Sequence, residues 1–154
     1  MGMMDSSDRA RPSPRSDFRW FREVQPQWRD NDIYGHVNNA VHYTWFDSTV
    51  NGWLLEQGFI EIGKSNVAGL VVSSSCEYFS EVAFPDRVVC GIRVAYVGKT
   101  SVRYELGLFR NDDPQSFAFG RFVHAYVNLA TRRPVDLSPL LREALMRYLS
   151  FRGN

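Results

Sequence analysis

The sequence predicts an α+β fold, in which an antiparallel sheet of about five strands covers one long helix. Three observations support this fold class. The chain has 154 residues, the usual length of one domain with a single core. Residues 39–57 carry apolar side chains at helical spacing, whereas the segments between residues 70 and 129 alternate between apolar and polar side chains. Strands joined by short turns pair antiparallel, and only their sheet can cover the apolar face of the helix.

The N-terminal part of the chain changes character near residue 17. Residues 1–16 are rich in Ser, Pro, Arg and Asp and show no apolar periodicity, which predicts a flexible tail followed by one folded domain over residues 17–154. Phe18, Trp20 and Val24 are evenly spaced, which predicts a first strand. Pro26 interrupts this pattern and favours a position at the edge of the sheet.

The predicted long helix has recognisable ends. Asn38 or Asn39 can cap its start, and Gly58 can adopt the left-handed conformation that ends a helix. Residues 60–69 carry no clear signal and are predicted to form a loop or a helical turn. The buried face of the helix is predicted to consist of His42, Tyr43, Phe46, Thr49, Val50, Trp53 and Leu54.

Four strands and a short helix are predicted after Gly69. Alternation over residues 88–97 and 102–108, on either side of a short turn, predicts an antiparallel hairpin. The last strand covers residues 119–129. Ser138 precedes Pro139 at the first helical position, which predicts the start of a C-terminal helix.

One face of the last strand suggests an oligomer. A sheet that covers a helix with one face leaves its other face to be explained. Phe122, His124 and Tyr126 share a face of the last strand and are too apolar to lie against water alone. We therefore expect a dimer or a larger oligomer.

Composition excludes several classes of protein. The 18 Lys and Arg residues are balanced by 17 Asp and Glu residues, so the chain lacks the basic surplus of a nucleic-acid-binding protein. No apolar run approaches the ~20 residues that span a bilayer, and residues 1–17 lack the apolar region of a secretory signal. We therefore expect a cytoplasmic protein without a membrane or nucleic-acid partner. Cys76 and Cys90 fit small buried side chains better than a disulfide framework or a zinc site.

A polar segment between the first strand and the helix holds the candidate chemistry. Residues 28–39 contain Asp30, Asp32 and His36 together with three asparagines. The start of a helix offers unpaired N–H groups and the positive end of the helix dipole, which suit an oxyanion. Gly35 allows the backbone to approach a ligand closely. The same residues also have structural interpretations, because Asp30 and Asp32 can form turns or caps, His36 can hold the loop, and Asn38 can cap the helix.

The motif Asp30-x-Asp32-x-x-Gly35-His36-Val37-Asn38-Asn39, followed by Tyr43 and Phe46-Asp47, resembles the acyl-CoA thioesterases of the hotdog fold. The resemblance is closest to the 4-hydroxybenzoyl-CoA thioesterase-like group. It implies a long central helix wrapped by an antiparallel sheet. It also implies a homodimer or homotetramer with the active site at the subunit interface and an acyl-CoA as the substrate.

The resemblance assigns roles to individual residues. Asp32, three residues before Gly35, matches the catalytic aspartate of the family. Asn39 matches the position whose backbone N–H binds the oxyanion. The remaining predicted substrate-binding residues are Gly35, His36 and Asn38 in the motif, Tyr43 and Phe46 for the acyl group, and Arg132 and Arg133 for the phosphates of CoA. Tyr43 and Phe46 could equally belong to the core, because rings at helical spacing usually do.

Several alternatives remain open at this stage. Asp32 could attack the thioester carbonyl, or it could deprotonate a water molecule that attacks instead. No cofactor is expected. Asp32, His36 and His42 do not have the spacing of a known metal motif. A non-catalytic acyl-CoA-binding module and a hotdog dehydratase are the alternative functions.

Overall fold

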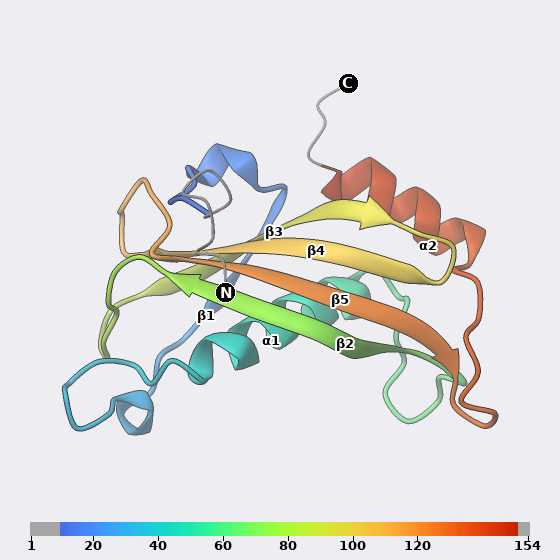
Figure 1. Cartoon of the computed structure of the whole chain (residues 1–154), viewed down its shortest axis with the longest axis horizontal. Coiled ribbons are helices and arrows are strands. Elements are labelled where there is room, and N and C mark those ends of the chain that lie inside the picture. The colour runs from blue at the N-terminus through green and yellow to red at the C-terminus, as the bar shows by residue number, and fades with distance from the viewer. Residues whose placement is uncertain (1–9, 151–154) are drawn as a thin grey trace, which may run out of the picture.

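The computed structural model describes residues 10–150 and contains a five-stranded antiparallel sheet curved around one long helix (Figure 1). This confirms the predicted α+β class and the arrangement of a hotdog fold. The strands are β1 (Trp20–Val24), β2 (Val67–Tyr78), β3 (Val88–Val97), β4 (Ser101–Arg110) and β5 (Ala118–Asn128), and the helices are α1 (Val41–Glu56) and α2 (Pro139–Ala144), with a π-helical turn at Leu145–Leu149 and single 3-10 turns at Arg15–Asp17 and Trp28–Asp30.

The order of the strands in the sheet is β1-β3-β4-β5-β2. Strands β3 and β4 form the predicted antiparallel hairpin, β5 pairs antiparallel with β4, and the two earlier strands lie at the edges. β1 pairs with β3 through Trp20 and Ile92, and β2 pairs with β5 from Val67 opposite Asn128 to Tyr78 opposite Ala118. The expected edge position of the first strand is therefore confirmed, and β2 forms the second edge.

The predicted helix ends are found with a small shift at the start. α1 begins at Val41. Just before it, the Asn38 side chain accepts a hydrogen bond of 2.9 Å from the N–H of Ala40, and the Asn38 carbonyl accepts one of 2.9 Å from the N–H of Val41. Gly58 has a φ of +82° and ends the helix as predicted. Ser138 Oγ accepts a hydrogen bond of 3.1 Å from the N–H of Leu141, so the predicted cap of α2 is confirmed.

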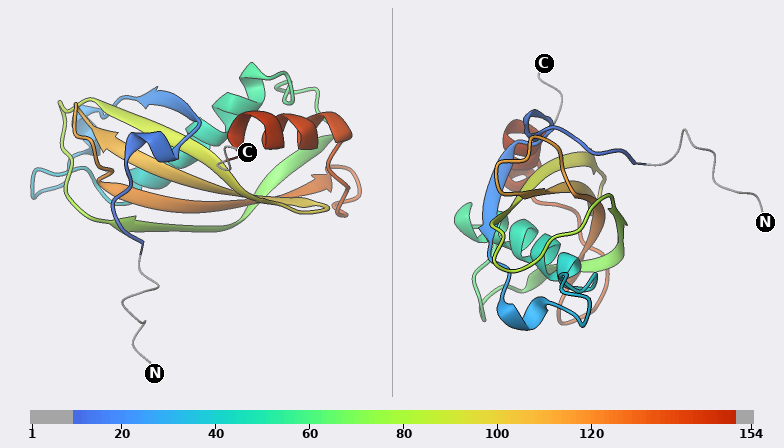
Figure 2. Two further views of the ribbon diagram at one scale, coloured as in Figure 1. Left: turned by 90° about the horizontal axis from the view of Figure 1, so that it is seen from above. Right: turned by 90° about the vertical axis from the view of Figure 1, so that its left-hand side faces the viewer.

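The core lies between α1 and the concave face of the sheet (Figure 2). Phe46, Val50 and Trp53 of α1 pack in one cluster with Tyr104 and Leu106 of β4. Gly120 of β5 allows the closest approach, because a Cβ atom at this position would lie 2.4 Å from the Phe46 ring. The large rings of α1 therefore depend on a position without a side chain in the sheet.

We expect Gly120→Ala to lower the free energy of unfolding by about 1–3 kcal/mol, because the added methyl group overlaps a fully buried ring that has no room to move. Urea unfolding followed by circular dichroism measures this change. Gly52→Ala in α1 is the matched control. Its Cβ would meet only the flexible end of Arg22, so the helix propensity of alanine should leave stability unchanged or raise it by up to about 1 kcal/mol. Equal losses in both variants would contradict this account of the packing.

The prediction for the face of β5 is wrong. Phe122, His124 and Tyr126 are buried, and they face α1 rather than the outside of the sheet. The register explains this, because Phe122 pairs with Tyr104 and His124 pairs with Val102, and these β4 residues belong to the helix-facing core. These three residues therefore give no support to an oligomer.

The N-terminal segment covers part of the outer face of the sheet. Phe18, Phe109 and Phe119 form a second apolar cluster there. Ser13 and Ser116 exchange two hydrogen bonds of 2.9 Å, and the Arg15 guanidinium donates to the carbonyls of Asn111 and Asp113. Residues 10–16 of the expected tail thus contact the sheet, and residues 1–9 lie outside the described part of the chain. Across residues 10–150, no helix is long and apolar enough to span a membrane.

Candidate active site

The segment between β1 and α1 is held together by its own acidic residues. Asp30 ends the 3-10 turn that starts at Trp28, and its Oδ2 accepts a hydrogen bond of 2.7 Å from the N–H of Gln27. The carbonyl of Asp30 also accepts the N–H of Asn38 at 2.8 Å. Asp30 therefore has the capping role that the sequence suggested as one interpretation.

Asp32 begins a tight turn that returns the chain to the helix. Its Oδ1 accepts hydrogen bonds from the N–H of Tyr34 at 2.9 Å and of His36 at 3.3 Å. Its own N–H donates to the carbonyl of His36 at 2.8 Å, and Gly35 sits at a φ of +80°. Gly35 is thus required by the turn. No described residue donates a hydrogen bond to Oδ2 of Asp32, so one carboxylate oxygen is left for chemistry.

The turn is anchored to the segment that follows β2. His36 Nε2 lies 2.9 Å from the Glu81 carboxylate, and the N–H of Val37 donates to the carbonyl of Val82 at 2.8 Å. Asn31 Oδ1 accepts the N–H of Phe84 at 3.0 Å. These contacts join two segments that lie about 50 residues apart in the sequence. His36 therefore holds the position of the Asp32 turn.

The start of α1 faces the same region. Tyr78, the last residue of β2, donates a hydrogen bond of 3.0 Å from its hydroxyl to the carbonyl of Asn39. The backbone N–H of Asn39 makes no hydrogen bond to another described residue. It lies just before the helix, where the helix dipole adds a partial positive charge. This N–H can therefore bind an anion or a polarised carbonyl oxygen.

These features meet in a cleft of about 670 Å³. The cleft brings together three of the predicted site residues, Asp32, His36 and Asn39. Gly35 and Asn38 shape the turn and the helix start and do not line the cleft. The other lining residues, which include His42 and Tyr78, were not predicted as site residues.

Phe46, Arg132 and Arg133 lie away from the cleft, whereas Tyr43 is not part of its lining but lies beside the Tyr78 side chain, which is. Phe46 is fully buried in the core beside Gly120, and Tyr43 packs against it with ring centroids 6.1 Å apart. Arg132 and Arg133 follow β5, at the end of the sheet where β2 begins, whereas the cleft lies where β2 ends. The core interpretation of Phe46 is therefore the one that the packing supports.

His42 is the residue that sequence reasoning placed in the core and that also lines the cleft. It is only 3% exposed, and its ring contacts Trp45, Tyr78 and Phe117 at centroid distances of 5.3, 4.9 and 5.8 Å. Burial lowers the pKa of His42 to about 4, which leaves the ring uncharged at neutral pH. The available signal in the sequence was its position three residues after Asn39, in the first turn of the helix.

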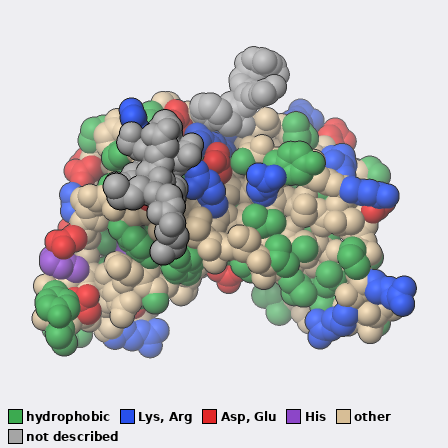
Figure 3. All heavy atoms as spheres, viewed as in Figure 1, with side chains coloured by type: hydrophobic (Ala, Val, Ile, Leu, Met, Phe, Trp, Pro, Cys, Tyr) green, Lys and Arg blue, Asp and Glu red, His purple; other side chains and the backbone are tan. Residues whose placement is uncertain are grey.

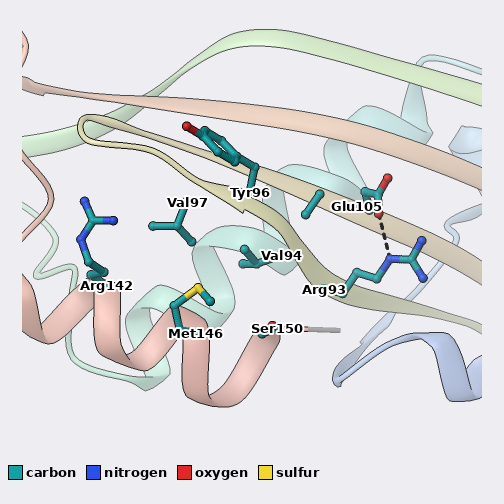
Figure 4. Close-up of a pocket in the computed structure, with 9 residues that line it drawn as sticks. Arg93, Val94, Tyr96, Val97, Glu105, Arg142, Met146 and Ser150 are labelled. Carbon is teal, nitrogen blue, oxygen red and sulfur yellow. Dashed lines mark hydrogen bonds and ion pairs between the residues drawn. The ribbon is translucent and has the colours of Figure 1, made fainter. Parts of the chain in front are cut away.

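A second cleft, of about 620 Å³, lies between β3 and α2 (Figure 4). Its charged side chains are already engaged, since Arg93 forms an ion pair of 2.9 Å with Glu105 and Arg142 donates to the carbonyl of Gly98 at 2.8 Å. It contains none of the predicted site residues. The cleft beside Asp32 is therefore the candidate active site.

Comparisons with known proteins agree with the fold and indicate a family. Residues 26–145 match the model of the Thioesterase-like superfamily. The crystal structure of the PA5185 protein from Pseudomonas aeruginosa strain PAO1 superposes with a TM-score of 0.87 at 46% identity, covering 91% of this chain and 98% of that chain. The structure of a thioesterase from Thermus thermophilus, complexed with coenzyme A and Zn, superposes with a TM-score of 0.72 at 25% identity, covering 84% and 98%.

One curated relative matches over a shorter region. The protein YsmA of Bacillus subtilis (strain 168), which has no described function, is 20% identical over 88 residues. These residues are 57% of this chain and 59% of YsmA, so the match spans less than two thirds of that relative.

Proposed function

The chain belongs to the thioesterase-like superfamily, and on this premise we propose that it hydrolyses an acyl-CoA thioester to a free acid and CoA. The observation that carries the proposal is the cleft that Asp32 and Asn39 both line. One carboxylate oxygen of Asp32 accepts no hydrogen bond from the described residues, and the backbone N–H of Asn39 donates none to them. A carboxylate and an N–H donor on one cleft match the two needs of acyl transfer, a nucleophile or base and an oxyanion site.

The proposed chemistry requires few groups. A thiolate leaving group has a conjugate-acid pKa near ~8.5, so its departure needs little help from a general acid. Asp32 either attacks the carbonyl carbon and forms a mixed anhydride, which water then hydrolyses, or takes a proton from a water molecule that attacks directly. In both routes the C–S bond breaks, the carbonyl oxygen becomes negative in the intermediate, and the N–H of Asn39 stabilises that charge.

The experiment that tests the proposal is thiol release from a panel of short, long and aromatic acyl-CoAs, followed with a thiol-reactive dye. Hydrolysis above the background rate with at least one member is the expected result. Tight binding of acyl-CoA without thiol release would replace the proposed hydrolase with an acyl-CoA-binding module. A change in C=C absorbance on a hydroxyacyl-CoA would indicate a dehydratase.

We also propose that the active form is a homodimer or a dimer of dimers, and the argument rests on the exposed edge strand β2. Leu70, Val71 and Val72 are exposed, with Val72 63% accessible, and Figure 3 shows hydrophobic side chains gathered over this side of the sheet. An open apolar edge strand invites pairing with another strand. A second copy of the chain could pair its β2 antiparallel with this β2, and the β2 edge of each copy would then be covered.

This arrangement gives a role to the two arginines that lie away from the cleft. Antiparallel pairing places the start of one β2 beside the end of the other. Arg132 and Arg133 of one copy, which lie near the start of β2, would then approach the cleft of the second copy, which lies near the end of β2. Their guanidinium groups suit the phosphates of CoA, so the active site would be completed at the subunit interface.

Val72→Lys is expected to convert the dimer into a monomer and to lower thiol release at least about tenfold, because a charge on the edge strand opposes pairing. Size-exclusion chromatography with light scattering measures the mass. Leu140→Lys is the control, since Leu140 is 73% exposed on α2, outside the proposed interface. A wild-type monomer, or a dimer that survives Val72→Lys, would show that β2 is not the interface.

A further inference from the structure

His42 presents an unsatisfied hydrogen-bonding group next to the proposed reaction site. Its side chain lies between three aromatic rings, and only 3% of the residue is exposed. Nδ1 is buried and makes no hydrogen bond to any described residue. None of the described residues makes a hydrogen bond with the other ring nitrogen, Nε2, either. Because the ring lines the cleft, Nε2 is the nitrogen that a ligand in the cleft can reach.

The imidazole is uncharged under working conditions. Burial is the main cause of its lowered pKa, and the neighbouring carbonyls of Asn38 and Asn39 offset only part of this effect. A neutral imidazole carries one N–H donor and one acceptor nitrogen. The ring therefore supplies a hydrogen bond rather than a proton or a positive charge.

The chemistry of a thioester determines what this ring can offer it. A thioester group has a carbonyl oxygen that accepts hydrogen bonds, and it has no donor. Asn39, just before α1, and His42, in the first turn of α1, both line the cleft. An acyl-CoA whose carbonyl oxygen lies at the N–H of Asn39 would therefore have the imidazole as its neighbour.

We propose that the imidazole N–H of His42 donates a hydrogen bond to the thioester carbonyl oxygen, as a second donor beside the backbone N–H of Asn39. This inference rests on the proposed thioester hydrolysis and adds a side chain to its oxyanion site. The bond strengthens as the carbonyl oxygen becomes negative, while the proton stays on the ring. Loss of the donor therefore lowers kcat more than it changes KM.

The chain offers a matched control in His124. This residue is 1% exposed, its Nδ1 also lacks a hydrogen-bond partner among the described residues, and rings of Tyr104, Phe122 and Tyr126 surround it. It lies outside the lining of the cleft. His42 and His124 thus share their burial and their missing bond, and they differ in access to the proposed substrate.

The first measurement compares His42→Phe with His124→Phe in the full-length protein. We expect His42→Phe to lower kcat about 10²-fold with KM within a few-fold of wild type, the effect of removing one oxyanion donor. Its midpoint of thermal unfolding should stay the same or rise, because an unpaired polar atom is replaced by an apolar one of similar size. His124→Phe should leave kcat unchanged. His42→Gln keeps an N–H donor and should recover part of the lost rate.

The second measurement does not depend on turnover. The chain contains three histidines, so the imidazole signals of protein labelled with ¹⁵N-histidine can be assigned with single variants. The probe is a ketone analogue of an acyl-CoA, in which a methylene group replaces the thioester sulfur and the carbonyl remains. We expect the ring N–H signal of His42, and not that of His124, to shift downfield as the analogue binds.

The outcomes separate this inference from the proposed function. If wild type hydrolyses thioesters and His42→Phe is equally fast, the hydrolase stands and the role of His42 is wrong. If wild type releases no thiol but the His42 signal responds to the analogue, hydrolysis is wrong and the hydrogen bond to the carbonyl stands. If the His42 signal is unchanged at saturation with the analogue, the inference is overturned.

Discussion

Asp32→Asn is expected to lower kcat for thiol release by about 10²–10⁴-fold, the range for loss of a positioned acid–base group. Asparagine retains Oδ1, so it can still accept the hydrogen bonds from the N–H groups of Tyr34 and His36 that shape the turn. The substitution removes the negative charge and the free carboxylate oxygen, on which both the nucleophilic and the general-base route depend. The steady-state rate with the best acyl-CoA of the panel is the measurement.

Asp30→Asn is the control for this experiment. Asp30 caps the neighbouring 3-10 turn through Oδ2, so its replacement should affect stability by about 1 kcal/mol and leave kcat within a few-fold of wild type. An Asp32→Asn enzyme as fast as wild type would remove Asp32 from the mechanism. Similar losses in both variants, together with reduced stability, would indicate a structural role for the loop acids.

The folded protein is expected to lose a large part of its free energy of unfolding between pH 6.5 and about pH 4. Burial lowers the pKa of both His42 and His124 from 6.5 to about 4. Below pH 6.5 the unfolded chain binds protons at these residues while the folded chain does not, so stability falls as the pH falls and levels off near pH 4. A pKa difference of 1 between the folded and unfolded chain corresponds to about 1.36 kcal/mol, so each histidine contributes about 3 kcal/mol of this loss. Together they rival the typical total of 5–15 kcal/mol.

Urea unfolding at several pH values between 7 and 4 measures this loss, and the variants assign it. Because carboxylates also titrate near pH 4, the difference between wild type and each variant is the informative quantity. His124→Phe and His42→Phe should each remove about half of the histidine contribution to the slope. A slope that is the same in wild type and in the double variant would show that these imidazoles are not buried in solution.

Much of the fold could be predicted because its signals are local. Gly58 and Ser138 stop and start helices through contacts within a few residues, and the alternation over residues 88–97 reports one strand. The prediction about which face of β5 points away from the helix was wrong for a different reason. Alternation shows that Phe122 and Tyr126 share a side, but only the pairing with β4 decides which side meets α1.

In the candidate site, too, local contacts could be predicted from the sequence and long-range contacts could not. Asp32, Gly35 and Asn39 belong to one short segment, so their sequence pattern was sufficient to place them near each other. Tyr78 and Glu81 reach the site from the end of β2, through long-range contacts that no local pattern predicts. Periodicity assigned His42 to the buried face of the helix, which is correct. It could not reveal that this part of the face borders a cleft.

The strand order has a consequence for synthesis on the ribosome. β1, α1 and β2 are made first, yet β1 pairs with β3 and β2 pairs with β5. About 70 residues separate the end of α1 from the end of β5, which is roughly 4–14 s of translation at 5–20 residues per second. During this interval the sheet that covers the apolar side of α1, with Trp45, Phe46 and Trp53, is incomplete. The nascent chain therefore exposes apolar surface and an unpaired β2 until its last strand has emerged.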